Sequence, residues 1–264
     1  MLFADYPVLV RGGGDLGTGV IVRLVRSGFP VFVTELERPL AVRRRVAVAA
    51  AVTEGSITIE GVRAVRVQDG AEARAAASRG DIPVLVSEGL ADVGARIVVD
   101  ARLAKRNIDT HLHDAEFVIA LGPGFISGVD CHVVIETARG HQLGRIIEHG
   151  SALADTGVPD SVDGRGAERV LRSPAAGSMV WTVEIGDRVR TGQAIGSIGG
   201  TTVHAPFDGI VRGLIDPSTP VQQGLKVGDI DPRLDTSVNQ VSDKAFAVGG
   251  GVLEAVLAWI SART

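Results

Sequence analysis

Cysteine and aromatic side chains are scarce in this sequence: its 264 residues include one cysteine, Cys131, and only 4% aromatics. A lone thiol cannot form an intramolecular disulfide or a metal site built from several cysteines, and it fits a reducing compartment. Apolar residues make up 45% of the chain and the net charge is -4, so we expect a folded protein rather than a disordered one. The length favours two domains.

Long hydrophobic runs and an excess of basic residues are also missing. The stretch VRRRVAVAAAV is flanked by arginines and stops at Thr53, well short of a membrane span, and the N-terminal segment does not resemble a signal peptide. The 27 basic residues are balanced by 31 acidic ones, which gives no electrostatic case for nucleic acid. We therefore expect a cytoplasmic protein that binds neither membranes nor nucleic acids, and homo-oligomers stay open.

Several catalytic signatures are absent. The sequence contains no G-x-S-x-G, no Walker phosphate-binding pattern, no H-E-x-x-H and no C-x-x-C. The standard hydrolase, kinase and zinc-protease classes therefore have no support.

A glycine-rich turn near the N-terminus gives the strongest local pattern. It lies between an apolar run at 7–11 and a segment of helical spacing at 18–27, and a β-branched run at 30–33 follows, which predicts a βαβ unit. The spacing G-x-G-x-x-G and an acid ending the next strand are typical of dinucleotide binding. The predicted cofactor-binding residues are Gly12, Gly13, Gly14, Asp15, Gly17 and Glu35. The alternative is that the glycines serve only a tight turn and close helix–strand packing.

A second glycine turn follows the apolar run at 117–121. Gly122 and Gly124 of this turn join the predicted cofactor-binding residues, because the carboxyl ends of parallel strands share one sheet edge, where ligands bind. Asp100 ends another predicted strand, and three cations follow it: Arg102, Lys105 and Arg106. For these cations the alternative is a solvated helix face.

The densest group of titratable side chains lies between residues 130 and 141. Its members are Asp130, Cys131, His132, Glu136 and His141. If residues 131–137 form a strand, His132 and Glu136 share a face and are candidates for an acid–base pair or, with Asp130 and His141, for metal ligands. The spacing matches no established metal signature, so the wet side of a strand is the alternative. Cys131 is either an acceptor of sulfur or selenium or a buried, inert thiol.

The C-terminal half contains an internal repeat of 32 residues. Residues 173–177 match 205–209, and residues 189–192 match 221–224. Two such short copies cannot each bury a face, so we predict that they interlock into one flattened β-barrel, a barrel-sandwich hybrid like biotinyl and lipoyl domains. The hairpin between the copies, at 199–202, has no lysine, so neither biotin nor lipoyl attachment is expected.

The predicted fold class is α/β, with a Rossmann-like parallel sheet followed by a duplicated all-β domain. The predicted segments are a Rossmann-like domain at 1–148, a linker at 149–167, the β-barrel at 168–232 and a C-terminal segment at 233–264. The last segment should carry a helix that packs back on the first domain. We expect this helix to begin at or soon after the glycine triplet at 249–251, because glycine destabilises helix interiors.

Several blocks of sequence resemble the YqeB-like family, which is named for the selenium-dependent molybdenum hydroxylase system. The resemblance covers nearly the whole chain and rests on VRGGGDLGTGV, TELERPLAVRR, VDARLAKRN, ALGPGFISGVDCHVVIETARGHQLGR and SDKAFAVGGGVLEAVL. It implies an accessory protein that helps to mature molybdenum hydroxylases, at the step of cofactor sulfuration, selenation or insertion, with a hydroxylase as its partner. The family supplies no catalytic residues to carry over.

Three functions therefore stay open at the level of sequence. The first is a maturation protein that binds a phosphate-bearing ligand, either a nucleotide such as NAD(P) or the molybdenum cofactor, at the glycine turns. The second is an NAD(P)-dependent oxidoreductase in which His132 or Glu136 transfers the proton. The third is a non-catalytic binding scaffold whose glycine turns are purely structural.

Overall fold

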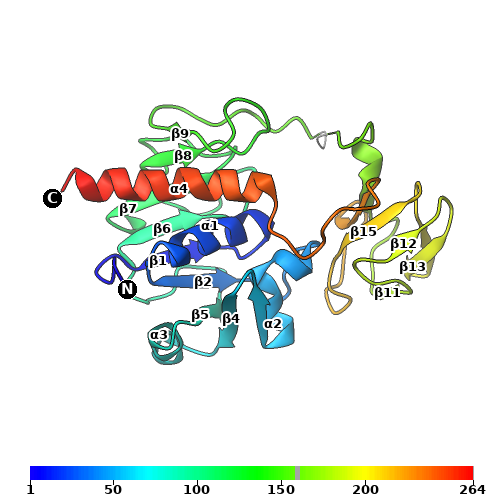
Figure 1. Cartoon of the computed structure of the whole chain (residues 1–264), viewed down its shortest axis with the longest axis horizontal. Helices are drawn as coiled ribbons and strands as arrows, with labels where there is room; N and C mark the ends of the chain where they lie inside the picture. Colours follow the sequence, from blue (N-terminus) through cyan, green and yellow to red (C-terminus); the bar gives the residue numbers. More distant parts are fainter. Residues whose placement is uncertain (158–160, 264) are drawn as a thin grey trace. The chain divides into compact units, whose positions relative to one another are not determined.

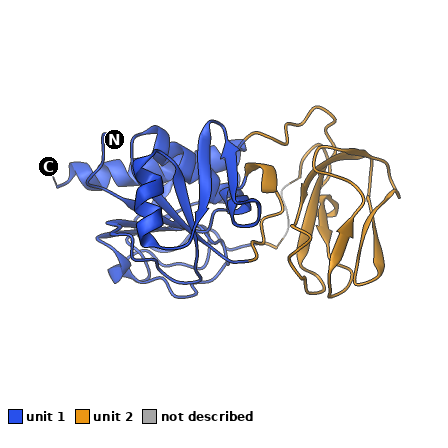
Figure 2. Cartoon of the chain, turned by 90° about the horizontal axis from the view of Figure 1, so that it is seen from below, with its two compact units in different colours: residues 1–37, 47–155, 241–264 blue, residues 38–46, 156–240 orange. Residues whose placement is uncertain are grey.

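The computed structural model describes residues 1–157 and 161–263. The chain divides into two compact units (Figure 2). Unit 1 contains Met1–Glu37, Ala47–Asp155 and Val241–Thr264, and unit 2 contains Arg38–Val46 and Thr156–Gln240. Unit 2 thus includes a short excursion from the first part of the chain, which the predicted boundaries did not contain. Within the predicted linker, residues 158–160 lie outside the described residues.

Unit 1 is built on a nine-stranded mixed sheet in the order β3-β4-β5-β2-β1-β6-β7-β8-β9 (Figure 1). The strands from β4 to β8 are parallel, whereas β3 and β9 pair antiparallel at the two edges. The strand bounds are β1 Val8–Arg11, β2 Val31–Glu35, β3 Ser56–Ile59, β4 Val62–Val67, β5 Ile82–Val86, β6 Ile97–Asp100, β7 Phe117–Leu121, β8 Val133–Ile135 and β9 Ile146–Ile147.

The predicted Rossmann-like parallel sheet is wrong. Both edges of the sheet are antiparallel, and few of its crossovers are helical. Within the described part of unit 1, α1 (Asp15–Arg26) and α3 (Gly70–Ser78) are the helices of two turns or more that connect parallel strands. The crossover from β6 to β7 contains only the short 3₁₀ helix η3 (Leu112–Asp114), and that from β7 to β8 is a loop. Buried apolar runs identified the strands, but they carry no information about the connections.

Two apolar cores cover the two faces of this sheet. Alternate residues of β1 point to opposite sides, so that Val8 and Val10 join one core and Leu9 joins the other. The first core receives α1 and the C-terminal helix α4 (Asp243–Ser261), and the second receives the alanine face of α3. The helix α3 begins after Asp69, whose side chain accepts hydrogen bonds from the amides of Ala71 and Glu72.

The C-terminal helix contains the glycine triplet, contrary to the prediction that it begins there. A Cβ on Gly249 would lie 2.5 Å from the carbonyl oxygen of Gly19 in α1, and one on Gly251 would overlap the carbonyl oxygen of Gly144. The glycines therefore let α4 lie directly against α1 and its neighbours (Figure 1). Tertiary contact outweighs the helix propensity of glycine.

This helix is also the one described helix that is long and apolar enough to cross a membrane. Half of its most apolar window is buried inside the protein. Its apolar residues, among them Val248, Val252 and Val256, belong to the first core of unit 1. These contacts are those of a core helix.

Unit 2 consists of two antiparallel sheets, in the orders β10-β16-β15-β12 and β11-β13-β14. The strand bounds are β10 Val170–Arg172, β11 Met179–Trp181, β12 Arg188–Val189, β13 Ala194–Ile198, β14 Thr201–His204, β15 Gly209–Leu214 and β16 Lys226–Asp231. The prediction of one barrel-sandwich hybrid is wrong, because these strands are hydrogen-bonded as two separate sheets of four and three strands and close no single barrel.

The 32-residue period is nevertheless present in the strand pairing. Met179 pairs with Ile198 in one sheet, and the residues 32 positions later, Val211 and Ile230, pair in the other. A second match joins the two sheets in the same way: Leu171 pairs with Gly228, and their repeat equivalents, Val203 and Gly196, also pair. Each copy of the repeat therefore contributes strands to both sheets, and neither copy forms a sheet alone.

Candidate functional site

The first glycine turn connects β1 to α1 and is occupied by a side chain of the protein itself. The amide of Gly13 donates a hydrogen bond of 2.8 Å to Oε2 of Glu35, and the amide of Leu36 donates one of 2.8 Å to Oε1. Burial raises the pKa of Glu35, although both backbone hydrogen bonds oppose the rise. A phosphate would need the Gly13 amide that Glu35 already holds.

The other side of the turn is covered by the segment around η2 (Val48–Ala50). The carbonyl of Gly13 accepts hydrogen bonds from the amide of Ala49 at 2.8 Å and from Oγ1 of Thr18 at 3.2 Å. A Cβ on Gly13 would lie 2.9 Å from the Ala49 nitrogen, and one on Gly17 would overlap the carbonyl oxygen of Gly12. A Cβ on Gly12 would lie 3.0 Å from the Cα of Arg102. Gly12, Gly13 and Gly17 are thus required by close packing within the chain.

Gly14 is the exception in this turn. A Cβ placed on it meets nothing within 4 Å, and its φ of -67° suits any residue. Gly14 is the N-cap of α1, and Asp15 is its first helical residue. Of the predicted cofactor-binding glycines in this turn, Gly14 is the one that leaves room for a ligand, while a nucleotide at the whole fingerprint stays a prediction.

The second glycine turn supports a neighbouring loop. Gly122 has a φ of +73° and a Cβ there would lie 2.5 Å from Oγ1 of Thr137. Gly124 has a φ of +101° and packs against the backbone of Arg106, and its carbonyl accepts a 2.9 Å hydrogen bond from the amide of Asn107. The loop that connects β6 to η3 is therefore fixed in part by this turn.

A buried charged cluster lies at the carboxyl edge of the sheet, between the two turns. Arg11 ends β1, is 1% exposed, and pairs in register with Asp100 at the end of β6. In the sheet, β1 lies between β2 on one side and β6 on the other, and the later strands extend outward from these two neighbours. Arg11 and Asp100 therefore lie at the point where the strand order reverses. Ligands of open α/β sheets bind at such a point.

Thr110 joins the charges of this cluster. Its hydroxyl donates to Oδ2 of Asp100 at 2.6 Å and accepts hydrogen bonds of 3.1 Å from Nη1 of Arg11 and from Nη2 of Arg102. Arg102 also binds Asp100, with Nη2 2.6 Å from Oδ2. Asp109 closes the cluster toward solvent, with Oδ1 2.9 Å from Nη2 of Arg11 and 2.7 Å from Nη2 of Arg102. We call Arg11, Asp100, Arg102, Asp109 and Thr110 the switch-point cluster.

The predicted catalytic candidates are engaged by the backbone. Nδ1 of His132 accepts a 3.0 Å hydrogen bond from the amide of Val118, and burial, together with Arg263 and His113, lowers the pKa of His132. Glu136 is 2% exposed, and its carboxylate accepts hydrogen bonds from three amides, those of Thr137, Ala138 and Leu153. Both side chains fix loops, which leaves proton transfer by either one a prediction without geometric support.

Cys131 lies in an environment that suppresses its reactivity. Its side chain is fully buried, and this burial, together with the nearby charge of Asp130, raises the pKa of the thiol to about 12. A thiol is nucleophilic as its thiolate. The environment therefore favours the inert alternative over an acceptor of sulfur or selenium.

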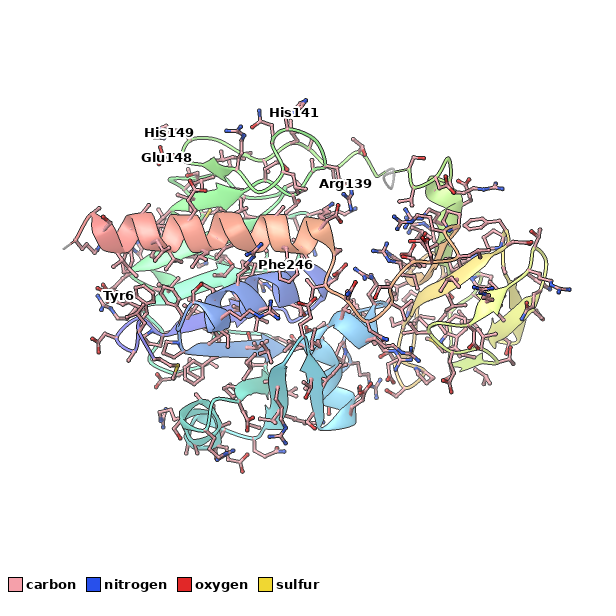
Figure 3. The ribbon with its side chains drawn as sticks, in the orientation of Figure 1. Tyr6, Arg139, His141, Glu148, His149 and Phe246 are labelled. Atoms are coloured by element: carbon pink, nitrogen blue, oxygen red, sulfur yellow. The ribbon has the colours of Figure 1, made fainter. Side chains whose placement is uncertain are left out.

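The candidate metal ligands are not brought together. Asp130 binds the side chain of Asn107 and the amide of Ile126. His141 is exposed and projects from the loop between β8 and β9, on the same side of unit 1 as Arg139 (Figure 3). Among residues 1–157 and 161–263 no three His, Cys, Asp or Glu side chains are placed to hold a metal ion.

Sequence reasoning found Asp100 and Arg102 but missed Arg11, Asp109 and Thr110. Arg11 is a charged residue that ends an otherwise apolar strand, which is an unusual position for an arginine unless it is paired. That position was the available signal. The partners of Arg11 lie 98 and 99 residues away in the sequence, so no local pattern connects them.

Comparison with known proteins assigns the family. No protein-family model matches the chain. The chain is 48% identical over 254 residues, 95% of its length, to the "Uncharacterized protein YqeB" of Escherichia coli strain K12. It belongs to the YqeB-like family, as the sequence blocks predicted. The chain spans about half of this relative, 47% of its length.

Two solved structures show weak similarity. One is an aspartoacylase family protein from Mesorhizobium loti, with a TM-score of 0.27 and 10% identity over 87% of each chain. The other is a succinylglutamate desuccinylase/aspartoacylase from Rhodobacter sphaeroides, with a TM-score of 0.28 and 18% identity, covering 87% of this chain and 86% of that one.

Proposed function

We propose that the protein is an accessory protein in the maturation of molybdenum hydroxylases, including selenium-dependent ones. We further propose that it binds a phosphate-bearing small molecule, the molybdenum cofactor, at the carboxyl edge of β1 and β6. One observation carries the proposal of ligand binding: Arg11 is only 1% exposed and lies where the strand order reverses. Arg102 lies beside it, and a Cβ on Gly14 at the same sheet edge would meet no atom within 4 Å. The maturation half rests on the YqeB-like sequence blocks.

The cluster has the chemistry that a phosphate group needs. Two guanidinium groups approach one point, and their planar donors match the oxygens of phosphate in pairs. The amides at the start of α1 lie at the same sheet edge, and the positive end of a helix dipole favours an anion. The hairpin of unit 2 at 199–202 has no lysine that could carry a prosthetic group. We therefore expect unit 2 to provide the surface that contacts the client hydroxylase in the cytoplasm.

Calorimetric titration with the molybdenum cofactor, with NAD and NADP as comparators, tests the ligand half. We expect heat with the cofactor and a weakened affinity in Gly14→Ala, because a methyl group there enters the open space without touching the protein. The melting temperature of Gly14→Ala should fall by only about 2–4 °C, because alanine is a poorer N-cap than glycine but meets no atom of the protein. A folded sample that gives no heat with any of the three compounds would refute ligand binding.

A second experiment tests the maturation half. A molybdenum hydroxylase produced in cells that lack this protein should be purified and assayed for activity and for its sulfur and selenium content. We expect an inactive enzyme whose activity returns when the protein is supplied. A fully active hydroxylase without it would exclude the accessory role.

A binding scaffold without a small ligand is the second candidate, and a specific observation favours it. Gly12, Gly13, Gly17 and Gly124 each lie against backbone atoms of the same chain, as purely structural glycines would. Under this alternative, Gly14→Ala changes no affinity. The oxidoreductase hypothesis has no comparable support, because His132 and Glu136 are already held by backbone amides.

A further inference from the structure

The carboxylate of Asp109 bridges the two arginines of the switch-point cluster, as the oxygens of a bound anion would. Its two oxygens lie 2.9 Å from Nη2 of Arg11, and Oδ1 lies 2.7 Å from Nη2 of Arg102. The side chain of Arg11 is 1% exposed and that of Arg102 is 18% exposed, whereas that of Asp109 is 45% exposed. Arg11 is therefore part of the protein interior and Arg102 is largely covered, whereas the carboxylate that bridges them faces solvent.

The loop that carries Asp109 has no regular secondary structure. Residues 101–110 contain no helix or strand, and two non-glycine residues there, Leu103 and Lys105, have positive φ angles of 52° and 61°. Such conformations are unfavourable for these residue types and persist only when surrounding contacts impose them. Asn107 supplies one anchor through Thr110 and Asp130, and Asp109 supplies another through the two arginines.

The charges of the cluster explain why Asp109 would give way to a ligand. Arg11 and Arg102 carry two positive charges, and Asp100 and Asp109 carry two negative ones. Asp100 is 1% exposed and binds Thr110 and Arg102, so it cannot leave without stranding a buried charge. Asp109 can turn into water, and an arriving oxyanion then restores the balance of charge at the same two guanidinium groups.

Resting on the proposed function, we propose that Asp109 occupies the seat of the ligand phosphate and that the ligand displaces it. Asp109 is thus an internal competitor that keeps Arg11 and Arg102 paired while the site is empty. The hydrogen bond from Arg11, followed by that from Arg102, lowers the pKa of Asp109, so the carboxylate is charged and competes at neutral pH. Nε of Arg11 is buried and has no hydrogen-bond partner among the described residues, so this arginine keeps a donor that the protein itself does not use.

Titration of the full chain with inorganic pyrophosphate tests this proposal. Three proteins are compared by calorimetry: the wild type, Asp109→Ala and the matched control Asp155→Ala. Asp155 is 38% exposed and pairs with Lys105 of the same loop at 2.6 Å, so its loss removes the same charge outside the arginine pair. We expect Asp109→Ala to bind pyrophosphate about tenfold more tightly than the wild type, as loss of a competing charged hydrogen bond predicts. Asp155→Ala should remain within about twofold, as expected for an exposed ion pair outside the seat.

Each other outcome has a definite meaning. Equal strengthening in Asp109→Ala and Asp155→Ala indicates a general charge effect and overturns the proposal. An affinity of Asp109→Ala at or below that of the wild type makes Asp109 a structural residue and also overturns it, while the proposed ligand site stands. If none of the three folded proteins binds pyrophosphate, both the proposal and the phosphate chemistry of the proposed site are refuted.

Discussion

The glycine triplet of α4 gives a sharp test of the packing in unit 1, because its members differ in their surroundings. A Cβ on Gly250 meets nothing within 4 Å, whereas one on Gly249 would lie 2.5 Å from the carbonyl oxygen of Gly19 and one on Gly251 would overlap that of Gly144. Alanine is favoured over glycine in a helix by about 1 kcal/mol. The same substitution should therefore have opposite signs at adjacent positions.

The expected magnitudes follow from these distances. Gly250→Ala should stabilise the protein by about 1 kcal/mol. Gly249→Ala gains the same propensity but forces α4 away from α1, and overpacking of this kind costs about 1–3 kcal/mol or more, so that variant should be less stable than Gly250→Ala by about that amount. In a unit of this size each kcal/mol changes the melting temperature by about 2–4 °C.

The assay is urea unfolding monitored by circular dichroism, with the wild type and both variants measured together. The two tryptophans of the sequence also allow unfolding to be followed by fluorescence. Equal stability of Gly249→Ala and Gly250→Ala would refute the close approach of the two helices. Gly250→Ala also serves as the control, because it changes the same helix by the same atoms.

Two further predictions concern groups of the candidate site. Glu35→Gln should destabilise the protein by about 1–3 kcal/mol, because glutamine has one acceptor oxygen and leaves either the Gly13 or the Leu36 amide without its acceptor. Burial raises the pKa of Glu35 in the folded state, so the wild type should lose stability as the pH rises through the range just above 4.5, and Glu35→Gln should not show that slope in urea titrations at several pH values. Cys131 should resist alkylation by iodoacetamide at pH 8 in the native protein and react once the protein is unfolded; fast native labelling would contradict a thiol pKa of about 12.

The sequence predicted those parts of the fold that depend on neighbouring residues. The alternating apolar and polar residues at 55–67 predict a hairpin, and the alanine-rich residues at 69–79 predict a helix. The structure places the hairpin of β3 and β4 and the helix α3 in these segments. The βαβ start was also correct. The order of the strands, the antiparallel edges and the glycines within α4 depend on contacts between distant segments, which local patterns do not record.

The same distinction applies to the candidate site. The two glycine turns follow β1 and β7, as predicted, because glycine clusters after apolar runs carry a local signal. Glu35, predicted as a cofactor-binding residue, accepts a hydrogen bond from the Gly13 amide in the structure, and the segment at 47–50 packs against the other side of the turn. A role of Glu35 in cofactor binding stays a prediction. Arg11 and its partners came together through the register of β1 with β6, which cannot be inferred from either strand alone.

The discontinuity of unit 1 affects the order in which the protein can fold during synthesis. The strands of the sheet are complete by β9, yet the helix that covers α1 comes only after residue 240, beyond the whole of unit 2. Until then, the apolar face of α1 that receives Val248 and Val252 has no cover. Because domains generally fold as units during translation, unit 2 should be folded on the ribosome while unit 1 still exposes hydrophobic surface. Unit 1 is therefore the unit that we expect to depend on chaperones.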